Sequence, residues 1–406
     1  MLQPINSPQV RISNIRILLT AIRDNGPISK RELQRETGLS WGTVSSLTTM
    51  LLHGGYVVAV GKQSTSAGRK PDELDINLID NYIVGIDLNI TGLCAVVTDM
   101  KGRIVQEWMR FFARLDYDCI LQTMYALLDD LFQEYAGKHI LGIGMAVQGT
   151  VNTHNGVSVQ IPQVSRWHDV PLRELLEQRY HTPVILWHDP NCVMFAERVF
   201  GSPRMAAAQN ALLIRLDQGI GLSILSNGKL HLGVSGESGE LSHIPMEDNG
   251  PLCTCGNHGC LGAYASGSGI IQRTIEQINQ NRPTQLVTES IQTLTYREIA
   301  AAARHGDALS LEVFRQMGEK MGMALSSLYN LFNPELSVMY GDLCQYKELF
   351  VLPLQEQLQR HLYRNLPAQL IFSELGKNAP ARGAALMASD HAILTMEFRE
   401  LSNDAG

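Results

Sequence analysis

The chain opens with apolar positions that recur at a helical period. The first stripe, with the spacing i, i+3, i+4 and i+7, consists of Ile15, Leu18, Leu19 and Ile22. This spacing predicts an amphipathic helix that begins at about Ser13. The capping box Ser29 to Glu32 predicts a second helix, and Ser40 is the expected cap of a third. Two short helices around a glycine-containing turn are typical of a helix-turn-helix, whose second helix enters the DNA major groove.

The polar face of the third predicted helix is suited to contacts with DNA. The side chains expected to point outward are Trp41, Thr43, Ser45, Ser46 and Thr48, next to the cap Ser40. Most are small and polar, so the helix can approach phosphates and base edges closely. A strand is expected at residues 56–60, followed by a basic hairpin or wing. Arg69 and Lys70 in this wing are placed to reach a minor groove or the DNA backbone.

Charge supports the same interpretation. The first 70 residues hold nine Lys or Arg and three acids, a net charge of +6, whereas the rest carries −13 of the total of −7. A basic segment ahead of an acidic body favours contact of that segment with a polyanion such as double-stranded DNA. The alternatives are a solvated basic surface and a small three-helix interaction module.

Beyond residue 80 the pattern changes to alternating strands and helices. Examples are the strand "ILGIGMAV", the helix "VPLRELLEQRY" and the strand-to-helix segment "PVILWHDPNCVMFAERVFG". This alternation predicts an α/β fold of sheets flanked by helices, with ligands near the strand ends. The expected domains are a winged helix-turn-helix and linker over 1–72, a first lobe over 81–205 closed by a helix over 377–398, and a second lobe over 206–373.

The chain lacks the sequence features of exported and membrane proteins. Its apolar residues, 45% of the total, suffice for buried cores. No apolar run approaches the roughly 20 residues of a membrane span, and the N-terminus lacks the apolar core of a secretory signal. A cytoplasmic protein without membrane insertion is therefore expected.

The segment "HIPMEDNGPLCTCGNHGC" predicts a metal site. One imidazole and three thiols come from His243, Cys253, Cys255 and Cys260. A Cys3His set suits tetrahedral Zn²⁺, and four protein ligands close the coordination shell, so one structural zinc ion per chain is expected. The alternative is three free thiols that cluster by chance. His258 lies in the same loop and is expected to be a surface residue.

Several motifs in order resemble one family. They are "GIDLNITGLCAVVTDMKGRIV", "GIGMAVQGTV", "HDPNCVMFAE", "GIGLSILSNGKLHLGVSGESGELSHIP", "CTCGNHGCL", "NLFNPELSVMYGD" and "RGAALMA". Together they resemble the ROK family of repressors, open reading frames and sugar kinases, over about residues 81–395. The resemblance implies a two-lobed fold like that of actin and hexokinase. With the helix-turn-helix ahead of it, the whole chain resembles the sugar-responsive repressors of this family.

The resemblance also implies a sugar site between the lobes. Asp189 matches the catalytic base of the kinases, and His188 replaces the asparagine that usually precedes it. Glu240 matches a glutamate that contacts sugar hydroxyls. His243 matches the histidine that ligates zinc on one nitrogen and can bond the sugar with the other. Gln163 stands where the kinases often have a sugar-contacting asparagine.

Departures from the family pattern argue against kinase activity. The kinases' first phosphate turn reads Asp-x-Gly-Gly-Thr, and here Asn89 and Ile90 replace the two glycines. The adenine-side Gly-Gly pair of the kinases is also altered and reads Tyr340-Gly341-Asp342 here, and Asp342 adds negative charge near the expected nucleotide position. Gly262 replaces a sugar-contacting glutamate, and Ser242 replaces a glycine, so the ligand preference is expected to differ.

These observations predict a repressor of sugar uptake or catabolism genes rather than an enzyme. Its expected partners are an operator in double-stranded DNA, a sugar or sugar-phosphate effector, and further copies of itself as a homodimer or tetramer. One alternative is an ATP-dependent sugar kinase with an added DNA-binding domain, in which Asp189 is the base. Another is control by a protein partner, which the short polar C-terminal tail disfavours.

Overall fold

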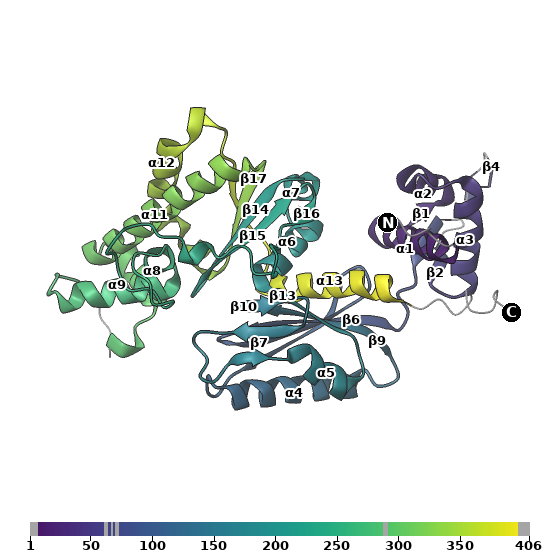
Figure 1. The fold of residues 1–406 in the computed structure, drawn as a ribbon, viewed down its shortest axis with the longest axis horizontal. Helices are drawn as coiled ribbons and strands as arrows, with labels where there is room; N and C mark the ends of the chain where they lie inside the picture. Colours follow the sequence, from purple (N-terminus) through teal and green to yellow (C-terminus); the bar gives the residue numbers. More distant parts are fainter. Residues whose placement is uncertain (1–6, 61–63, 66–67, 70–72, 287–290, 397–406) are drawn as a thin grey trace. The chain divides into compact units, whose positions relative to one another are not determined.

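The computed structural model describes residues 7–60, 64–65, 68–69, 73–286 and 291–396. The chain forms two compact units. Unit 1 comprises Met1–Met145, Pro171–Leu186 and Ala381–Gly406, and unit 2 comprises Ala146–Val170 and Trp187–Pro380. Figure 1 labels their helices and strands.

Three helices and a small sheet form the N-terminal part of unit 1. The helices are α1 (Ser7–Asn25), α2 (Lys30–Thr37) and α3 (Trp41–His53). β5 (Glu73–Ile76) pairs on one side with β1 (Ile28–Ser29) and on the other with β2 (Val57–Val60). A two-stranded hairpin is made by β3 (Ser64–Thr65) and β4 (Gly68–Arg69), within the expected wing.

Local sequence signals explain these helices. The hydroxyl of Ser29 accepts from Glu32 N and the Glu32 carboxylate accepts from Ser29 N, so the predicted capping box is formed. Ser40 caps α3 through Thr43 N, as expected. α1 begins at Ser7, earlier than the prediction of Ser13, because Pro8 is tolerated in the first turn of a helix.

The larger sheet of unit 1 has the strand order β13-β9-β6-β7-β8. These strands are β6 (Asn81–Asn89), β7 (Gly92–Thr98), β8 (Ile104–Phe111), β9 (His139–Val147) and β13 (Val184–His188). The helices that accompany them are α4 (Tyr117–Glu134), α5 (Leu172–Tyr180) and α13 (Ala379–Thr395).

Glycines let α13 pack directly on this sheet, beside β6 and β9 (Figure 1). A Cβ built on Gly85 would lie 2.0 Å from Ala381 O, and one built on Gly144 would lie 2.0 Å from Ala384 O. Any larger residue at these two positions would therefore push the helix away from the sheet.

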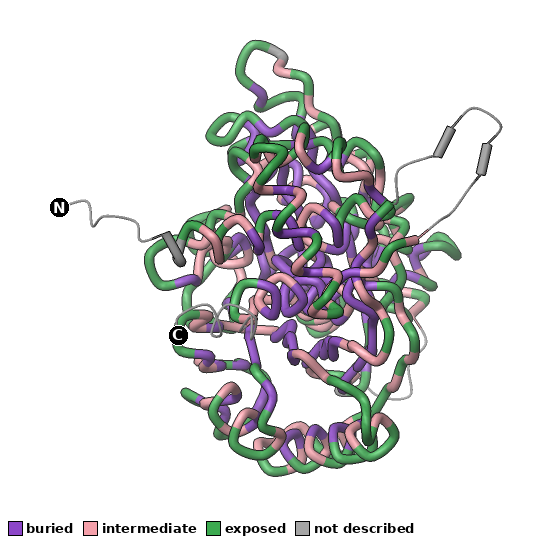
Figure 2. The backbone as a smooth tube through the Cα atoms, turned by 90° about the vertical axis from the view of Figure 1, so that its right-hand side faces the viewer, coloured by how far each residue is buried: buried purple, intermediate pink, exposed green. Residues whose placement is uncertain are grey.

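Unit 2 is built on a second five-stranded sheet with the order β16-β15-β14-β17-β18. Its strands are β14 (Ala211–Leu216), β15 (Ile220–Ser226), β16 (Lys229–Leu230), β17 (Leu336–Tyr340) and β18 (Leu370–Phe372). Figure 2 draws buried residues in purple, and these include most of β14, β15 and β17. A small separate sheet contains β10 (Thr150–Asn152), β11 (Val157–Gln160) and β12 (His168–Val170).

Helices complete unit 2. They are α6 (Asp189–Phe200), α7 (Pro203–Ala207), α8 (Gly262–Ala265), α9 (Gly267–Asn279), α10 (Tyr296–Arg304), α11 (Ala308–Phe332) and α12 (Val351–His361). Short 3-10 helices are η1 (Leu241–His243), η2 (Ile291–Thr293), η3 (Asp342–Leu349) and η4 (Tyr363–Asn365). The main apolar core of the unit joins the sheet to α9, α10, α11 and α12.

Candidate functional site

The predicted metal ligands of unit 2 come together in one cluster, which we call the thiol cluster: His243, Cys253, Cys255 and Cys260. Their four ligand atoms all lie within 4.8 Å of one another. His243 Nδ1 is 3.6 Å from Cys253 Sγ, and Cys255 Sγ is 3.8 Å from Cys260 Sγ. Two thiolates bound to one tetrahedral Zn²⁺ at about 2.3 Å are about 3.8 Å apart, so the spacing fits a metal ion of this kind.

Backbone pairing between its two sides holds the loop around the thiol cluster together. Isolated bridges pair Pro245 with Cys260 and Leu252 with His258. Gly259 has φ +70°, and a Cβ there would lie 1.8 Å from Glu247 O, so only glycine fits. His258 is exposed and its Nδ1 lies 3.0 Å from Gly250 O, outside the cluster.

Electrostatics favour a cation at this place. Burial and the neighbouring thiols Cys253 and Cys255 raise the pKa of the Cys260 thiol. Three thiolates so close together repel one another, and a divalent cation removes that penalty by binding them in the deprotonated form. The cluster can therefore hold a metal ion.

A second polar cluster lies where β13 runs into α6. Asp189 is the first residue of α6, and its side chain is only 6% exposed. His188 Nε2 lies 3.3 Å from Asp189 Oδ1. Pro190 follows in the first turn of α6, and its ring packs closely against β15, since a Cβ on Gly221 would lie 2.5 Å from Pro190 Cγ. These contacts fix the carboxylate at the end of the strand.

Two residues that the sequence analysis missed complete this cluster. Arg215, on β14, donates from Nη1 to Asp189 Oδ2 and from Nε to Asp217 Oδ2, the latter at 2.7 Å. Its side chain is 11% exposed. We call Asp189, Arg215 and Asp217 the carboxylate cluster. The signal that could have revealed it is a lone arginine inside the otherwise apolar strand "ALLIRL".

Burial controls protonation in this region. It raises the pKa of Asp189 to about 6, with Arg215 opposing the rise and Asp217 adding to it. Burial lowers the pKa of His188 to about 4, with Glu240 opposing and Arg215 adding. At neutral pH the imidazole is thus uncharged and the carboxylate is ionised. The cation that balances Asp189 is Arg215, not His188.

Asp342 is tied to the same region. Its backbone N donates to Asp217 Oδ1 at 2.6 Å. Its carboxylate is paired with Arg297 at 2.7 Å and lies 3.6 Å from Lys377 Nζ. The negative charge that Asp342 was expected to add is thus accompanied by two cations from other segments.

The remaining residues of the expected sugar site lie in loops of unit 2. Glu240 is exposed and directly precedes η1, which ends at His243 of the thiol cluster. Gln163 is exposed in the turn between β11 and β12. A Cβ on Gly262 would lie 2.2 Å from Ser242 Oγ, so the serine hydroxyl occupies the space that a larger residue at 262 needs.

The altered phosphate turn of unit 1 is held by its own side chains. Asn89 Nδ2 donates to Asp87 Oδ2 at 2.9 Å, and Asn89 Oδ1 accepts from Thr91 N at 2.9 Å. The side-chain amide of Asn89 lies within the turn, and its oxygen already accepts the hydrogen bond from the backbone N–H of Thr91. An arrangement of this kind stabilises the turn itself.

The residues expected to contact DNA lie on or beside α3. Ser40 and Trp41 are exposed at its start, Trp41 with 48% of its surface. Thr43 and Ser45 are half-buried and Ser46 is exposed. Arg69 belongs to β4, but its side chain and all of Lys70 lie outside the described residues.

The expectation that Thr48 also points outward is wrong. Thr48 is buried and its hydroxyl donates to Val44 O at 2.6 Å, while Thr49 is exposed instead. A threonine whose hydroxyl bonds the preceding turn can be buried in a helix without an unsatisfied polar group.

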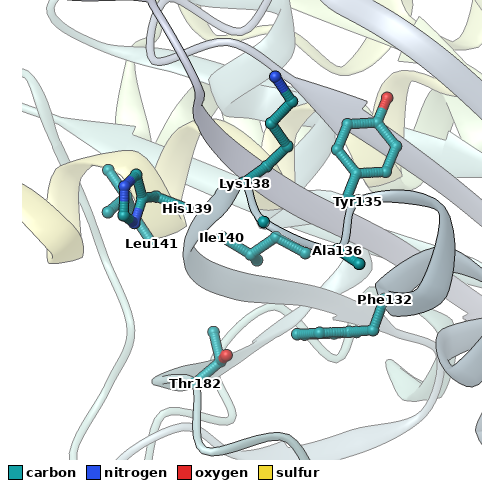
Figure 3. A pocket seen from close by; sticks show the side chains of 9 residues that line it. Phe132, Tyr135, Ala136, Lys138, His139, Ile140, Leu141 and Thr182 are labelled. Atoms are coloured by element: carbon teal, nitrogen blue, oxygen red, sulfur yellow. The ribbon is translucent and has the colours of Figure 1, made fainter.

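A separate pocket lies in unit 1 at the end of α4. Its volume is about 350 Å³, and Figure 3 shows Phe132, Tyr135, Lys138 and Thr182 among its lining. Lys138 is paired with Asp80. None of the residues expected to bind DNA, metal or sugar lines this pocket.

Comparison with known proteins identifies the family. Residues 83–391 match the ROK family, and residues 13–58 match a winged helix-turn-helix DNA-binding family. The chain belongs to the ROK family. The predicted fold class, a winged helix-turn-helix ahead of a ROK domain, is confirmed. Among the described residues, no helix is long and apolar enough to cross a membrane.

Relatives match this ROK chain over nearly its whole length. It is 29% identical to the xylose repressor of Bacillus subtilis strain 168, covering 95% of this chain and 97% of that protein. It is 25% identical to the DNA-binding transcriptional dual regulator NagC of Escherichia coli K12, covering 94% of each.

Solved structures give the same picture. A ROK family transcriptional regulator, described as a homolog of the E. coli MLC protein, superposes with a TM-score of 0.81 at 26% identity, covering 95% of this chain and 97% of that one. A ROK glucokinase from Streptomyces griseus, solved with glucose and AMPPNP, gives a TM-score of 0.65 at 27% identity, covering 76% of this chain and 99% of that one.

Proposed function

We propose that this protein is a sequence-specific DNA-binding repressor whose affinity for its operator is controlled by a sugar or sugar phosphate. The observation that carries the proposal is that a winged helix-turn-helix and a ROK domain occur in one chain, and that relatives named as repressors match both parts. The kinase likeness covers 76% of the chain, whereas the regulator likeness covers 95%. The regulated genes are then those of sugar uptake or catabolism.

In this proposal α3 reads the operator. Ser40, Trp41, Thr43, Ser45 and Ser46 contact DNA, assisted by Arg69 and Lys70 of the wing. The exposure of Trp41 and Ser46 supports this assignment. The protein acts as a homodimer or tetramer, since two-fold operators mirror the symmetry of the proteins that bind them. The division into domains at 1–72, 81–205 and 206–373 belongs to the same proposal.

Asp189 is the proposed centre of the sugar site, with His188, Glu240, Gln163 and the second nitrogen of His243. A buried carboxylate at a strand end is a strong acceptor for sugar hydroxyls. The proposed ion in the thiol cluster is one structural Zn²⁺, because Cys253, Cys255, Cys260 and His243 complete four-fold coordination. It would hold η1 and the loop in place, and thereby position Glu240.

One observation favours the alternative of a sugar kinase. Asp189 is buried and its pKa is raised to about 6, as suits a general base. Against it, the Asn89 amide fills the first phosphate turn, and Arg215 and Asp217 place a bound ion pair beside Asp189. We therefore propose that the protein is not an enzyme.

A thermal-shift screen with sugars, amino sugars and their phosphates tests the proposal. A ligand that binds only the folded state raises the melting temperature by mass action. A compound that shifts melting and also changes DNA affinity supports a sugar-responsive repressor. ATP-dependent turnover of that compound would instead establish the kinase.

A further inference from the structure

Arg215 of unit 2 is a nearly buried cation that spans one buried acid, Asp189, and one half-buried acid, Asp217. It reaches Asp189 through Nη1 and Asp217 through Nε, so both sides of its guanidinium are used. Asp217 is in turn fixed by the backbone N of Asp342 at 2.6 Å. The guanidinium therefore has one orientation, determined from both ends.

This arrangement restricts what Asp189 can do. An ionised carboxylate accepts about four hydrogen bonds. Arg215 uses one position on Oδ2, His188 Nε2 lies 3.3 Å from Oδ1, and the carboxylate also accepts from the backbone N of Asp189, so about one position remains for a ligand. Proton uptake by Asp189 would leave a buried guanidinium beside a neutral group, which is unfavourable. At neutral pH Asp189 is thus an ionised acceptor of hydrogen bonds.

The charges around Asp189 also limit the ligand. Asp189 and Asp217 share one cation, and Glu240 acts electrostatically on the adjacent His188, whose imidazole is neutral at pH 7. Two carboxylates therefore share one arginine that is already engaged twice. A phosphate group added beside Asp189 would meet two carboxylates and an arginine that both of them already engage, which disfavours its binding.

We propose that Arg215 is the residue that sets the ligand specificity of this site: it holds Asp189 as a fixed acceptor for the hydroxyls of an unphosphorylated sugar. The inference rests on the proposed sugar site and narrows its ligand to sugars without an anionic group. Arg215 is a positioning residue here, because it acts on the ligand through Asp189.

Two substitutions test this in opposite directions in the full-length protein. Arg215→Met removes the cation, so Asp189 should protonate at a higher pH than in the unchanged protein. Asp217→Asn leaves Arg215 to Asp189 alone and removes a nearby negative charge, so Asp189 should protonate at a lower pH. Arg297→Met is the matched control, because Arg297 is 60% exposed and pairs with Asp342.

The probes are xylose, glucose and N-acetylglucosamine, each with its monophosphate, at pH values from 5 to 9. We expect one free sugar to bind at least about tenfold more tightly than its phosphate, and its affinity to rise with pH as Asp189 ionises. The midpoint of that rise should move up by about 1–3 units in Arg215→Met. The midpoint should move to lower pH in Asp217→Asn. It should not change in Arg297→Met, and it should change little in Arg215→Lys, which keeps a cation at this position.

The pH dependence of thermal unfolding gives the same test without a ligand. Because burial raises the pKa of Asp189 in the folded protein, its contribution to stability falls as pH rises from about 4 to about 6. That fall should extend to higher pH in Arg215→Met and end at lower pH in Asp217→Asn. If Arg215→Met does not fold, Asp217→Asn still decides the sign, and Arg215→Lys shows whether a cation at this position suffices.

Unmoved midpoints in both variants, or tighter binding of a phosphate ester than of its free sugar, would overturn this inference. Either result leaves the proposed repressor intact, provided that the ligand still changes DNA affinity. A different result would contradict the repressor proposal, namely that none of the sugars changes the affinity of the protein for any selected DNA sequence.

Discussion

The two polar clusters of unit 2 are balanced in opposite ways. The thiol cluster joins one histidine to three cysteines and contains no cation of its own. The carboxylate cluster joins two acids to an arginine that it supplies itself. The metal ion proposed for the first cluster must come from solution, whereas the second cluster has its cation in the chain itself. We therefore expect metal supply to affect the thiol cluster and to leave the carboxylate cluster unchanged.

The largest effect is expected from loss of the metal. Cys260→Ser, or treatment with a strong chelator, removes the proposed ion, and a structural zinc site contributes several kcal/mol to folding. We expect the metal content, measured by mass spectrometry of the purified protein, to fall from about one ion per chain to near zero. The melting temperature should fall with it.

His258→Ala is the control for this experiment, because His258 lies in the same loop but outside the thiol cluster. It should keep the metal. A chelated protein that melts at the same temperature as the untreated one would contradict a structural ion.

The next largest effect is expected from breaking the carboxylate cluster. Arg215→Met leaves Asp189 buried without its cation, which typically costs about 3–5 kcal/mol of folding free energy. Urea denaturation at pH 8 measures the loss. The double variant Arg215→Met, Asp189→Asn should recover part of it, because no buried charge remains. An equal loss in the single and double variants would show that Arg215 contributes packing rather than charge.

Acidification is expected to act differently on the two clusters. Thiols and imidazole must be deprotonated to bind metal, so lowering the pH from about 7.5 to about 5 should release the ion. Over the same range Asp189 takes up its proton, and the raised pKa of this group adds stability as the pH falls.

The His188 contribution has the opposite sign. Its pKa is lowered to about 4, so its contribution to stability is lost as pH falls below the ordinary value for histidine. Asp189→Asn and His188→Gln should thus change the pH dependence of unfolding in opposite senses. If the metal content of the protein did not change between about pH 7.5 and about pH 5, the predicted release of the ion from the thiol cluster would be contradicted.

The smallest effect is expected in unit 1, at a turn held without charge pairs or metal. Asn89→Gly with Ile90→Gly removes the amide hydrogen bonds to Asp87 and Thr91, each worth about 1 kcal/mol. The variant should be slightly less stable and should show no efficient ATP turnover in a coupled assay, because Arg215 still holds Asp189. Strong turnover would mean that the first turn alone prevents phosphoryl transfer.

The thiol cluster could be predicted from the sequence because its four ligands lie within 18 consecutive residues. The capping box at Ser29 is similarly local, and both were found as expected. The carboxylate cluster could not be predicted, since Asp189 and Arg215 belong to different elements and meet only when α6 packs against β14 and β15. The cations that accompany Asp342 come from segments 45 and 35 residues away.

Helical periodicity also failed at one position for a physical reason. Thr48 was expected on the polar face of α3, but its hydroxyl bonds Val44 O and lets the side chain pack inside. The residues at the start of α3 were placed by the cap at Ser40, which the sequence does reveal. The site residues Gln163 and Glu240 stay predictions.

The central claim is that DNA binding by this ROK protein is controlled by a sugar bound at Asp189. The most direct measurement selects DNA from a random duplex pool with the full-length protein, and then follows binding of the selected site by fluorescence anisotropy at moderate salt. We predict two half-sites whose centres are about 10–10.5 base pairs, or a multiple of that, apart. A free sugar should change the affinity by at least about fivefold, and Asp189→Asn should abolish that change while DNA binding persists. The account is contradicted if no sequence is selected, or if Asp189→Asn responds to the sugar as the unchanged protein does.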